Sequence, residues 1–274
     1  MNAGQTAITA PHIRNRKGGD NIVMLTAYDF TMAALVDPHV DMLLAGDTLG
    51  CVVQGHDTTL AVTLEEIIYH ARQVSRAAKH ALVVGDLPFG SYQLSPEQGL
   101  QSAIRLLKEA GVGAVKLEGG QRTWTTIKHL VDAGIPTVAH IGLTPQSIHA
   151  FGGNKVQGRE SQQARQLLAD AKAVADAGAF AVVIEAVPAP LAQEITAAIS
   201  IPTIGIGAGN DCDGQVLVIN DMLGLNAAPA AMKFNKEFCV LREHITNAAK
   251  QYAHEVRTGT FPAAQHSYGL QKVS

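Results

Sequence analysis

A short motif, an acidic residue followed by Ala and Gly, occurs three times in the chain, at residues 109–111, 132–134 and 176–178. Each copy lies between an Ala-rich or Leu-rich segment and a run of apolar residues. Gly readily adopts the left-handed backbone that ends a helix. Each copy is therefore predicted to join the end of a helix to the start of a buried strand. Three copies of one joint indicate a repeated helix–strand unit.

Strands and helices are predicted to alternate along most of the chain. The apolar runs interpreted as strands are residues 22–27, 42–46, 81–85, 114–118, 135–140, 180–185, 202–207 and 215–219. The helical patterns between and after them are residues 63–78, 95–111, 121–133, 161–177, 189–199 and 235–257, with short helices expected after the first and seventh strands. Thr63 with Glu66 and Ser95 with Gln98 have the spacing of capping boxes. Eight strands in about 250 residues predict a (β/α)8 barrel, and a doubly wound open sheet is the alternative.

Composition predicts an ordered globular domain. Of the 274 residues 47% are hydrophobic and only 16% are charged, which excludes wholesale disorder. The formal net charge of −3 does not favour binding to nucleic acid or to an anionic membrane. The low charged fraction is a mild indication of a homo-oligomer. Because no low-complexity linker divides the chain, we expect one domain over 1–274, with an N-terminal arm at 1–20 and a C-terminal tail at 258–274.

Three features predict a soluble, cytoplasmic protein. The three cysteines are widely spaced and form no C-x-x-C motif, so a disulfide framework or a structural zinc site is not expected. The first residues lack the pattern of a secretory signal. No run reaches the ~18 consecutive apolar residues of a membrane span.

Polar residues lie at the ends of five successive predicted strands. In a barrel of this kind the active site forms at the carboxyl ends of the strands. One acidic residue after a strand is often only the N-cap of the next helix, and a single Lys or His on a strand is often structural. The recurrence at one end of successive strands is harder to attribute to capping, and it selects Asp47, Asp86, Lys116, Glu118, His140 and Glu185.

The residue types of this set predict a chemistry. Asp47, Asp86 and Glu118 supply the hard oxygen ligands that Mg²⁺ prefers, and one of the three is expected to act through water. Open positions on such an ion admit a chelating 2-oxo acid, whose carboxylate Lys116 would neutralise. Glu185 lies among apolar residues, a setting that favours proton transfer near neutral pH.

Eight sequence blocks resemble the ketopantoate hydroxymethyltransferase family. They are LTAYD at 25–29, GDTLG at 46–50, DLPF at 86–89, VKLEGG at 115–120, HIGLTPQS at 140–147, FGGNKVQGR at 151–159, IEAVP at 184–188 and GIGAG at 205–209. The resemblance extends from about residue 20 to about residue 267. It implies a barrel of the phosphoenolpyruvate/pyruvate type. It also implies transfer of a one-carbon unit from 5,10-methylenetetrahydrofolate to 3-methyl-2-oxobutanoate, which gives 2-dehydropantoate for pantothenate synthesis, by a decameric homo-oligomer.

The resemblance also implies roles for particular residues. Asp47, Asp86 and Glu118 fall at the positions of the Mg²⁺ site. The keto acid site would consist of Asp47, Thr48, Asp86 and Lys116. Glu185 would be the proton acceptor, and His140 would have a supporting role. Two positions depart from the family pattern, with Thr48 in place of the usual Ser and Asn220 where His is expected. The hypothesis is that Glu185 removes the C3 proton, that Mg²⁺ stabilises the resulting enolate, and that this carbon attacks the folate-derived methylene group.

Two other functions stay open at this point. One is a Mg²⁺-dependent C–C lyase of the same superfamily that acts on a 2-oxo or 2-hydroxy acid, which folate-independent turnover would reveal. The other is a non-catalytic barrel for assembly or ligand storage, against which the retained carboxylates argue. The GIGAG block is not read as a dinucleotide site, because Asn210 stands where that motif needs its third Gly, and a tight turn at the barrel rim is expected instead.

Overall fold

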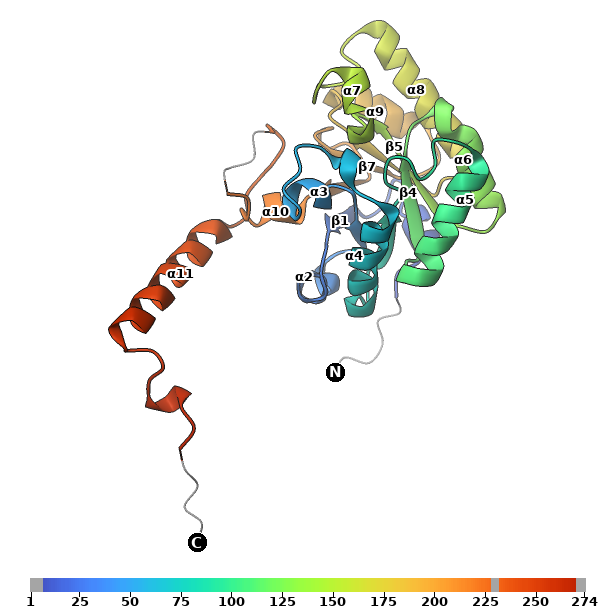
Figure 1. Cartoon of the computed structure of the whole chain (residues 1–274). Helices are drawn as coiled ribbons and strands as arrows, with labels where there is room; N and C mark the ends of the chain where they lie inside the picture. The colour runs from blue at the N-terminus through green and yellow to red at the C-terminus, as the bar shows by residue number, and fades with distance from the viewer. Residues whose placement is uncertain (1–6, 228–231, 270–274) are drawn as a thin grey trace. The chain divides into compact units, whose positions relative to one another are not determined.

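Eight parallel strands form a closed barrel in the computed structural model, which describes residues 7–227 and 232–269 (Figure 1). Each strand pairs with the next one along the chain, and the last pairs with the first. The strands are β1 (Ile22–Thr26), β2 (Met42–Ala45), β3 (Leu82–Asp86), β4 (Ala114–Glu118), β5 (Thr137–Gly142), β6 (Ala181–Glu185), β7 (Thr203–Ile206) and β8 (Gly214–Leu217). The (β/α)8 barrel is therefore confirmed, and the open sheet is wrong.

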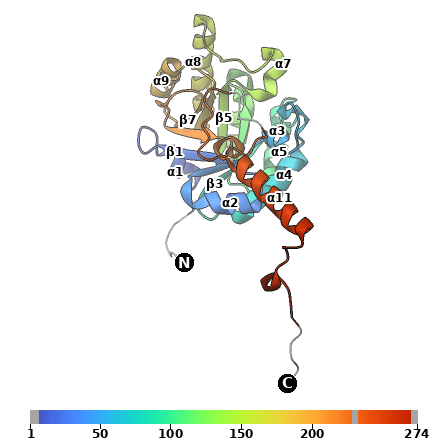
Figure 2. The ribbon, with the colours of Figure 1, turned by 90° about the vertical axis from the view of Figure 1, so that its left-hand side faces the viewer.

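Helices surround the strands on the outside of the barrel (Figure 2). They are α1 (Ala10–Arg14), α2 (Phe30–Val36), α3 (Leu49–Val52), α4 (Leu64–Ala77), α5 (Pro96–Arg105), α6 (Trp124–Asp132), α7 (Ile148–Phe151), α8 (Ser161–Asp176) and α9 (Ala189–Ala198). Helix α10 (Ile219–Met222) follows β8 in the chain. Single turns occur at η1 (Asp37–His39), η2 (Thr59–Ala61), η3 (Leu106–Ala110), η4 (Gln121–Thr123) and η5 (Pro145–Ser147). The inward face of α4 buries Ile67, Ala71 and Val74, spaced as one helical stripe.

The repeated acid–Ala–Gly motif ends helices as predicted. The φ angles are +72° at Gly111, +82° at Gly134 and +95° at Gly178, all in the region that residues with a Cβ rarely adopt. Gly111 is the C-cap after η3, which continues α5 without a break. These three glycines turn the chain from the helical layer into β4, β5 and β6.

The helix starts at Thr63 and Ser95 are confirmed, with one difference. The Thr63 hydroxyl accepts a hydrogen bond from the Glu66 N–H, and the Glu66 carboxylate accepts one from the Thr63 N–H, which completes a capping box. Ser95 caps α5 by accepting from the Gln98 N–H. The Gln98 side chain instead accepts from the Leu94 N–H, so the second box is only half formed.

Two predicted element boundaries and one predicted helix differ from the structure as follows. Strand β5 ends at Gly142 rather than at His140. Residues 207–213 turn from β7 into β8 without the short helix expected there. Helix α11 (Leu241–Thr258) begins six residues later than predicted, and the Asn235 side chain instead donates a hydrogen bond to Asp221 at 2.9 Å.

The N-terminal segment is anchored at the amino ends of the strands. Ile13 on α1 is fully buried, and the Ile8 N–H donates to the His80 carbonyl at 2.8 Å. The Lys17 ammonium lies 2.9 Å from the Asp213 carboxylate, immediately before β8. The part of the expected arm at 7–20 that the structure describes therefore packs on the barrel, and 1–6 lie outside the described residues.

The chain divides into two compact units, Met1–Ile219 and Asn220–Ser274. The first contains the whole barrel. The second contains α11 and η6 (Ala264–His266), and in it Arg242 forms two close ion-pair contacts with Glu237, at 2.6 and 3.0 Å. The single domain over 1–274 with a tail from 258 stays a prediction.

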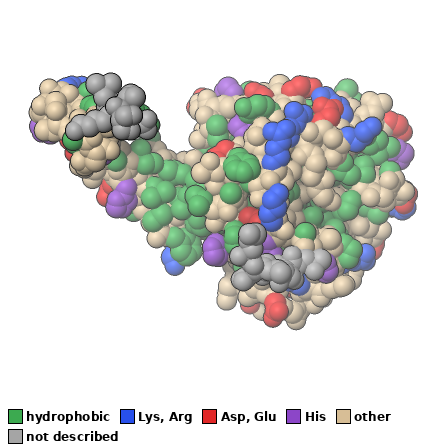
Figure 3. All heavy atoms as spheres, turned by 90° about the horizontal axis from the view of Figure 1, so that it is seen from below, with side chains coloured by type: hydrophobic (Ala, Val, Ile, Leu, Met, Phe, Trp, Pro, Cys, Tyr) green, Lys and Arg blue, Asp and Glu red, His purple; other side chains and the backbone are tan. Residues whose placement is uncertain are grey.

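Two properties relevant to nucleic-acid and membrane binding are the distribution of charged side chains on the surface and the length of apolar helices. Figure 3 shows a short run of Lys and Arg side chains on one face, with Asp and Glu side chains around it. In the part of the chain that the structure describes, no helix is long and apolar enough to cross a bilayer.

Candidate active site

The residues predicted to form the site lie at one end of the barrel. Strand register places Asp86 beside Lys116, Glu118 beside His140 and Gly142 beside Glu185. Asp47 and Thr48 follow β2 at the same carboxyl end. The structure therefore brings together the side chains that the sequence analysis selected from five strands.

A series of neighbouring charged groups connects four of these strands, β3 to β6. The Lys116 ammonium lies 3.0 Å from Asp86 Oδ2 and 3.4 Å from His140 Nδ1. His140 Nδ1 lies 3.5 Å from Glu118 Oε1, and His140 Nε2 lies 3.2 Å from Glu185 Oε2. Lys116, His140, Asp86 and Glu118 are buried, whereas the Glu185 side chain is 15% exposed. Among these four strands' acids at the barrel mouth, Glu185 is thus the one whose side chain is most exposed to solvent.

Burial and mutual repulsion perturb the acids of the site. The pKa of Asp47 is raised well above its usual value by burial and by the negative charges of Asp86 and Glu118. Burial also raises the pKa of Asp86, against the opposing effect of Lys116. Burial acts in the same direction on Glu118, but hydrogen bonding to His140 and its charge outweigh burial and lower the pKa of Glu118.

The two basic groups of the site are both held in the charged form. Burial alone would lower the pKa of Lys116, but the charges of Asp86 and Glu118 outweigh burial and raise it. Burial and the Lys116 charge would lower the pKa of His140, but Glu118 and Glu185 raise it to about 9. The buried part of the site therefore contains more acids than bases.

Tyr92 and Gln146 complete the site and were not selected from the sequence. The Glu118 N–H donates to the Tyr92 hydroxyl at 3.1 Å, and that hydroxyl donates to Gln146 Oε1 at 2.6 Å. Gln146 Nε2 donates to Asp47 Oδ2 and to the Leu87 carbonyl, both at 2.9 Å. The polarity of this network orients the Gln146 amide. Gln146 belongs to the HIGLTPQS block, which was the available signal for it.

The carboxylate oxygens of the site suit a cation that takes only one or two ligands from the protein. Among the described residues, no three His, Cys, Asp or Glu side chains converge closely enough to enclose a metal ion. Both Glu118 oxygens are engaged, one by His140 and the other by the Gln146 N–H at 3.0 Å. Asp86 Oδ1 is buried without a hydrogen-bond partner. Two carboxylates, Asp47 and Asp86, therefore stay available, which matches the one or two that Mg²⁺ usually takes.

Thr48 follows Asp47 and is half-buried at the start of α3. Although the family usually has Ser at this position, Thr also carries a hydroxyl that can form a hydrogen bond.

Comparisons with known proteins show the family and the fold of the chain. The ketopantoate hydroxymethyltransferase family model matches residues 7–264. The chain is 55% identical to the 3-methyl-2-oxobutanoate hydroxymethyltransferase of Oleidesulfovibrio alaskensis, over 96% of this chain and 91% of that protein. It is also 55% identical to the enzyme of the same name from Parvibaculum lavamentivorans, over 97% of this chain and 96% of that protein.

Solved structures show the same fold at low identity. A phosphoenolpyruvate phosphomutase from Streptomyces platensis subsp. rosaceus superposes with a TM-score of 0.61 at 16% identity, over 95% of this chain and 92% of that chain. A phosphonopyruvate hydrolase in complex with oxalate and Mg²⁺ gives 0.61 at 11% identity, over 94% and 93%. The family match over nearly the whole length, and the relatives at more than half identity, show that the chain belongs to the ketopantoate hydroxymethyltransferase family.

Proposed function

We propose that the protein transfers a hydroxymethyl group from 5,10-methylenetetrahydrofolate to 3-methyl-2-oxobutanoate and forms 2-dehydropantoate. The observation that carries this proposal is the excess of buried acids at the barrel mouth, with the more exposed Glu185 at its edge. In the net reaction the C3–H bond and both methylene C–N bonds break. A C3–CH₂ bond and a CH₂–OH bond form, with water as the source of the hydroxyl. The C3 proton and one water proton end on the two folate nitrogens.

The proposed metal is Mg²⁺, held directly by Asp47 and Asp86 and through water by Glu118. The unpartnered Asp86 oxygen and the two engaged oxygens of Glu118 support this division. When bound, Mg²⁺ supplies a Lewis acid that stabilises negative charge as it develops on the keto acid, a contribution of several kcal/mol.

Lys116 and Thr48 bind the substrate carboxylate in this proposal. The Lys116 ammonium has three N–H donors, and Asp86 and His140 contact it on one side. A donor is therefore left for a carboxylate that enters the mouth. The Thr48 hydroxyl supplies a second donor, and its extra methyl narrows the pocket relative to Ser.

Glu185 accepts the C3 proton in this proposal. Its carboxylate lies at the end of β6, and His140 Nε2 lies 3.2 Å from its Oε2. His140 supports Glu185 by holding the carboxylate in place. A positioned base of this kind contributes about 10²–10⁴-fold to proton abstraction.

We further propose a cytoplasmic homo-oligomer, a decamer. The free cysteines Cys51, Cys212 and Cys239 suit a reducing compartment. On α11, the apolar side chains Ile245 and Val256 are exposed, as expected of a helix that packs against another copy of the chain. Sedimentation of the full chain would measure the assembly, and a monomer at micromolar concentration would contradict it.

A coupled incubation tests the activity. Purified protein is mixed with 3-methyl-2-oxobutanoate, 5,10-methylenetetrahydrofolate and Mg²⁺, and the product is identified by mass spectrometry. We expect 2-dehydropantoate and tetrahydrofolate in equal amounts. Turnover of a 2-oxo or 2-hydroxy acid without folate would instead indicate the C–C lyase alternative. Calorimetry that detects no Mg²⁺-dependent binding of the keto acid would indicate a non-catalytic barrel.

A further inference from the structure

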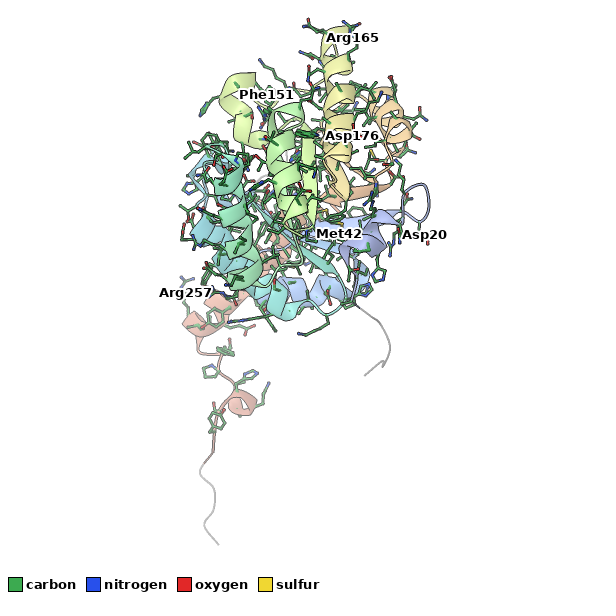
Figure 4. All side chains as sticks on the ribbon, turned by 90° about the vertical axis from the view of Figure 1, so that its right-hand side faces the viewer. Asp20, Met42, Phe151, Arg165, Asp176 and Arg257 are labelled. Atoms are coloured by element: carbon green, nitrogen blue, oxygen red, sulfur yellow. The ribbon has the colours of Figure 1, made fainter. Side chains whose placement is uncertain are left out.

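A cavity of about 570 Å³ lies beside the carboxyl ends of β4 and β5. Its walls are the carboxyl end of β5, the turn at η4 and the N-terminal half of α8, and α7 closes it on one side. Figure 4 shows Phe151, at the end of α7, beside the half of α8 that carries Arg165. We call it the α8 cavity, lined among others by Gln121, Arg122, Ile141, Gly142, Phe151 and Gln166. Its volume is in the range of about 300–1,000 Å³ that is usual for small-molecule sites.

Gly142 connects the wall of the α8 cavity with Glu185. Gly142 lines the cavity and pairs with Glu185 in the barrel. Its φ is +92°, and a Cβ there would fall 2.3 Å from the Glu185 carbonyl oxygen. A side chain at position 142 would therefore collide with β6, so at this point the backbone of β5 in the cavity wall packs directly against the strand that carries the proposed base.

A residue that lines the cavity is hydrogen-bonded to the residue after Glu185. The N–H of Gln157, another lining residue, donates to the Ala186 carbonyl at 2.8 Å. Ala186 itself has a φ of +49°, a left-handed conformation that is strained for a residue with a Cβ. The cavity wall and the chain at the proposed base are therefore held in one arrangement.

The lining combines side-chain amides with apolar surface. Asp170 Oδ1 accepts from the Gln121 N–H at 2.9 Å and from Gln166 Nε2 at 3.0 Å. Gln166 Nε2 also lies 2.9 Å from Gln121 Oε1. Phe151 and Leu167 add apolar area to the same cavity. Amides along an edge and flat apolar surface are the features that bind a planar heterocycle with hydrogen-bonding groups on its rim.

We propose that the α8 cavity binds the pteridine ring of the folate co-substrate. The inference rests on the proposed function, because that reaction needs a second organic reactant within reach of the keto acid carbon next to Glu185. A pteridine is a flat bicyclic ring whose amide-like and amino groups match glutamine side chains. Arg122, fixed by its hydrogen bond to Ser147 at 2.8 Å, supplies positive charge for the anionic end of the co-substrate.

A second cavity near the mouth is less suited. It has a volume of about 420 Å³ and is lined on its inner side by Glu118, Tyr92 and Gln146. The Tyr92 and Gln146 side chains bind each other at 2.6 Å, and neither contacts β6 in the hydrogen bonds described. A ligand there would meet this network instead of the strand that carries Glu185.

Two variants in the α8 cavity and one matched control test the proposal. Gln162→Trp fills the cavity from an exposed position on α8, and Gln166→Ala removes an amide. Thr125→Trp makes the same kind of change from an exposed position in the second cavity. The probe is tetrahydrofolate, titrated calorimetrically into the full-length protein with Mg²⁺ and 3-methyl-2-oxobutanoate present.

The expected result is a tetrahydrofolate Kd raised more than about tenfold by Gln162→Trp and about tenfold by Gln166→Ala. Thr125→Trp should leave this Kd within about twofold of the parent. Folate-independent exchange of the C3 hydrogen of the keto acid should continue in all three, which shows that each variant folds. Weakening by Thr125→Trp alone, or unchanged affinity in both α8-cavity variants, would overturn the assignment. A parent that binds no tetrahydrofolate would overturn the proposed function as well.

Discussion

Replacing Gln146 tests whether the buried amide holds the site together. Gln146→Met keeps the volume of the side chain and removes its hydrogen bonds. The three short bonds that account for the cost are those to Asp47 at 2.9 Å, to the Leu87 carbonyl at 2.9 Å and from Tyr92 at 2.6 Å; a fourth, longer bond from the exposed Gln93 at 3.3 Å contributes little. At about 1 kcal/mol for each neutral bond and about 2 kcal/mol for the bond to Asp47, the variant should lose about 4 kcal/mol of unfolding free energy. Its Mg²⁺ affinity should fall about 10–100-fold, because Asp47 is no longer held.

Urea unfolding measures the first effect, and calorimetric titration of Mg²⁺ at saturating keto acid measures the second. Tyr92→Phe provides a milder change, since it removes the hydroxyl that joins Glu118 to Gln146, and it should cost about 1–2 kcal/mol. Gln93→Ala is the matched control, because Gln93 is exposed and contacts Gln146 only at 3.3 Å. A Gln146→Met protein with the urea midpoint and the Mg²⁺ affinity of the parent would refute the reasoning.

Three further outcomes follow from the structure. Glu185→Gln should slow folate-independent C3 hydrogen exchange about 10²–10⁴-fold in deuterated water while keto acid binding persists; exchange at the parental rate would show that another group is the base. Exhaustive chelation should abolish product formation, and added Mg²⁺ should restore it; undiminished activity would remove the metal from the proposal. Burial would raise the pKa of Asp213, but hydrogen bonds from Thr203, Lys17 and Gly18 outweigh burial and hold this pKa below its usual value. Its stabilisation is therefore present above the unfolded pKa of about 3.9 and is lost as pH falls through the lower folded pKa. Asp213→Asn should lower the unfolding free energy by about 1–3 kcal/mol at pH 7, and urea titrations should show this difference shrinking below about pH 4.

The barrel could be predicted because its signals are local. The Gly that ends a helix acts within a few residues, and so does the apolar run that forms the next strand. The error in β5 has a physical reason. A polar residue usually marks the end of a buried strand, but at the carboxyl end of this barrel the interior is polar. His140 therefore faces the site from within the strand, which continues to Gly142.

The acids of the site could also be predicted, because strand ends of one barrel meet at one face. The Tyr92–Gln146 network could not, since it depends on contacts between residues far apart in the chain. Gln146 and Asp47 are separated by 99 residues, and Gln146 and Leu87 by 59. Neither spacing nor composition specifies which way the Gln146 amide points; the Tyr92 hydroxyl does so in the folded protein.

Buried carboxylates at the two ends of the barrel differ in how many fixed hydrogen-bond donors surround them. At the amino end, Asp37 accepts hydrogen bonds from the backbone N–H groups of Lys79, His80 and Ala81, so its charge is fully compensated by fixed donors.

At the carboxyl end, Asp47 and Asp86 are equally buried but repel each other, and one Asp86 oxygen has no partner. Evolution of a merely stable fold would favour compensation at both ends, because an uncompensated buried charge costs several kcal/mol. At the carboxyl end, Lys116 and His140 offset only part of the acidic charge. A positively charged ligand therefore gains the most from binding there, and this asymmetry, rather than the number of acids, distinguishes the site from the scaffold.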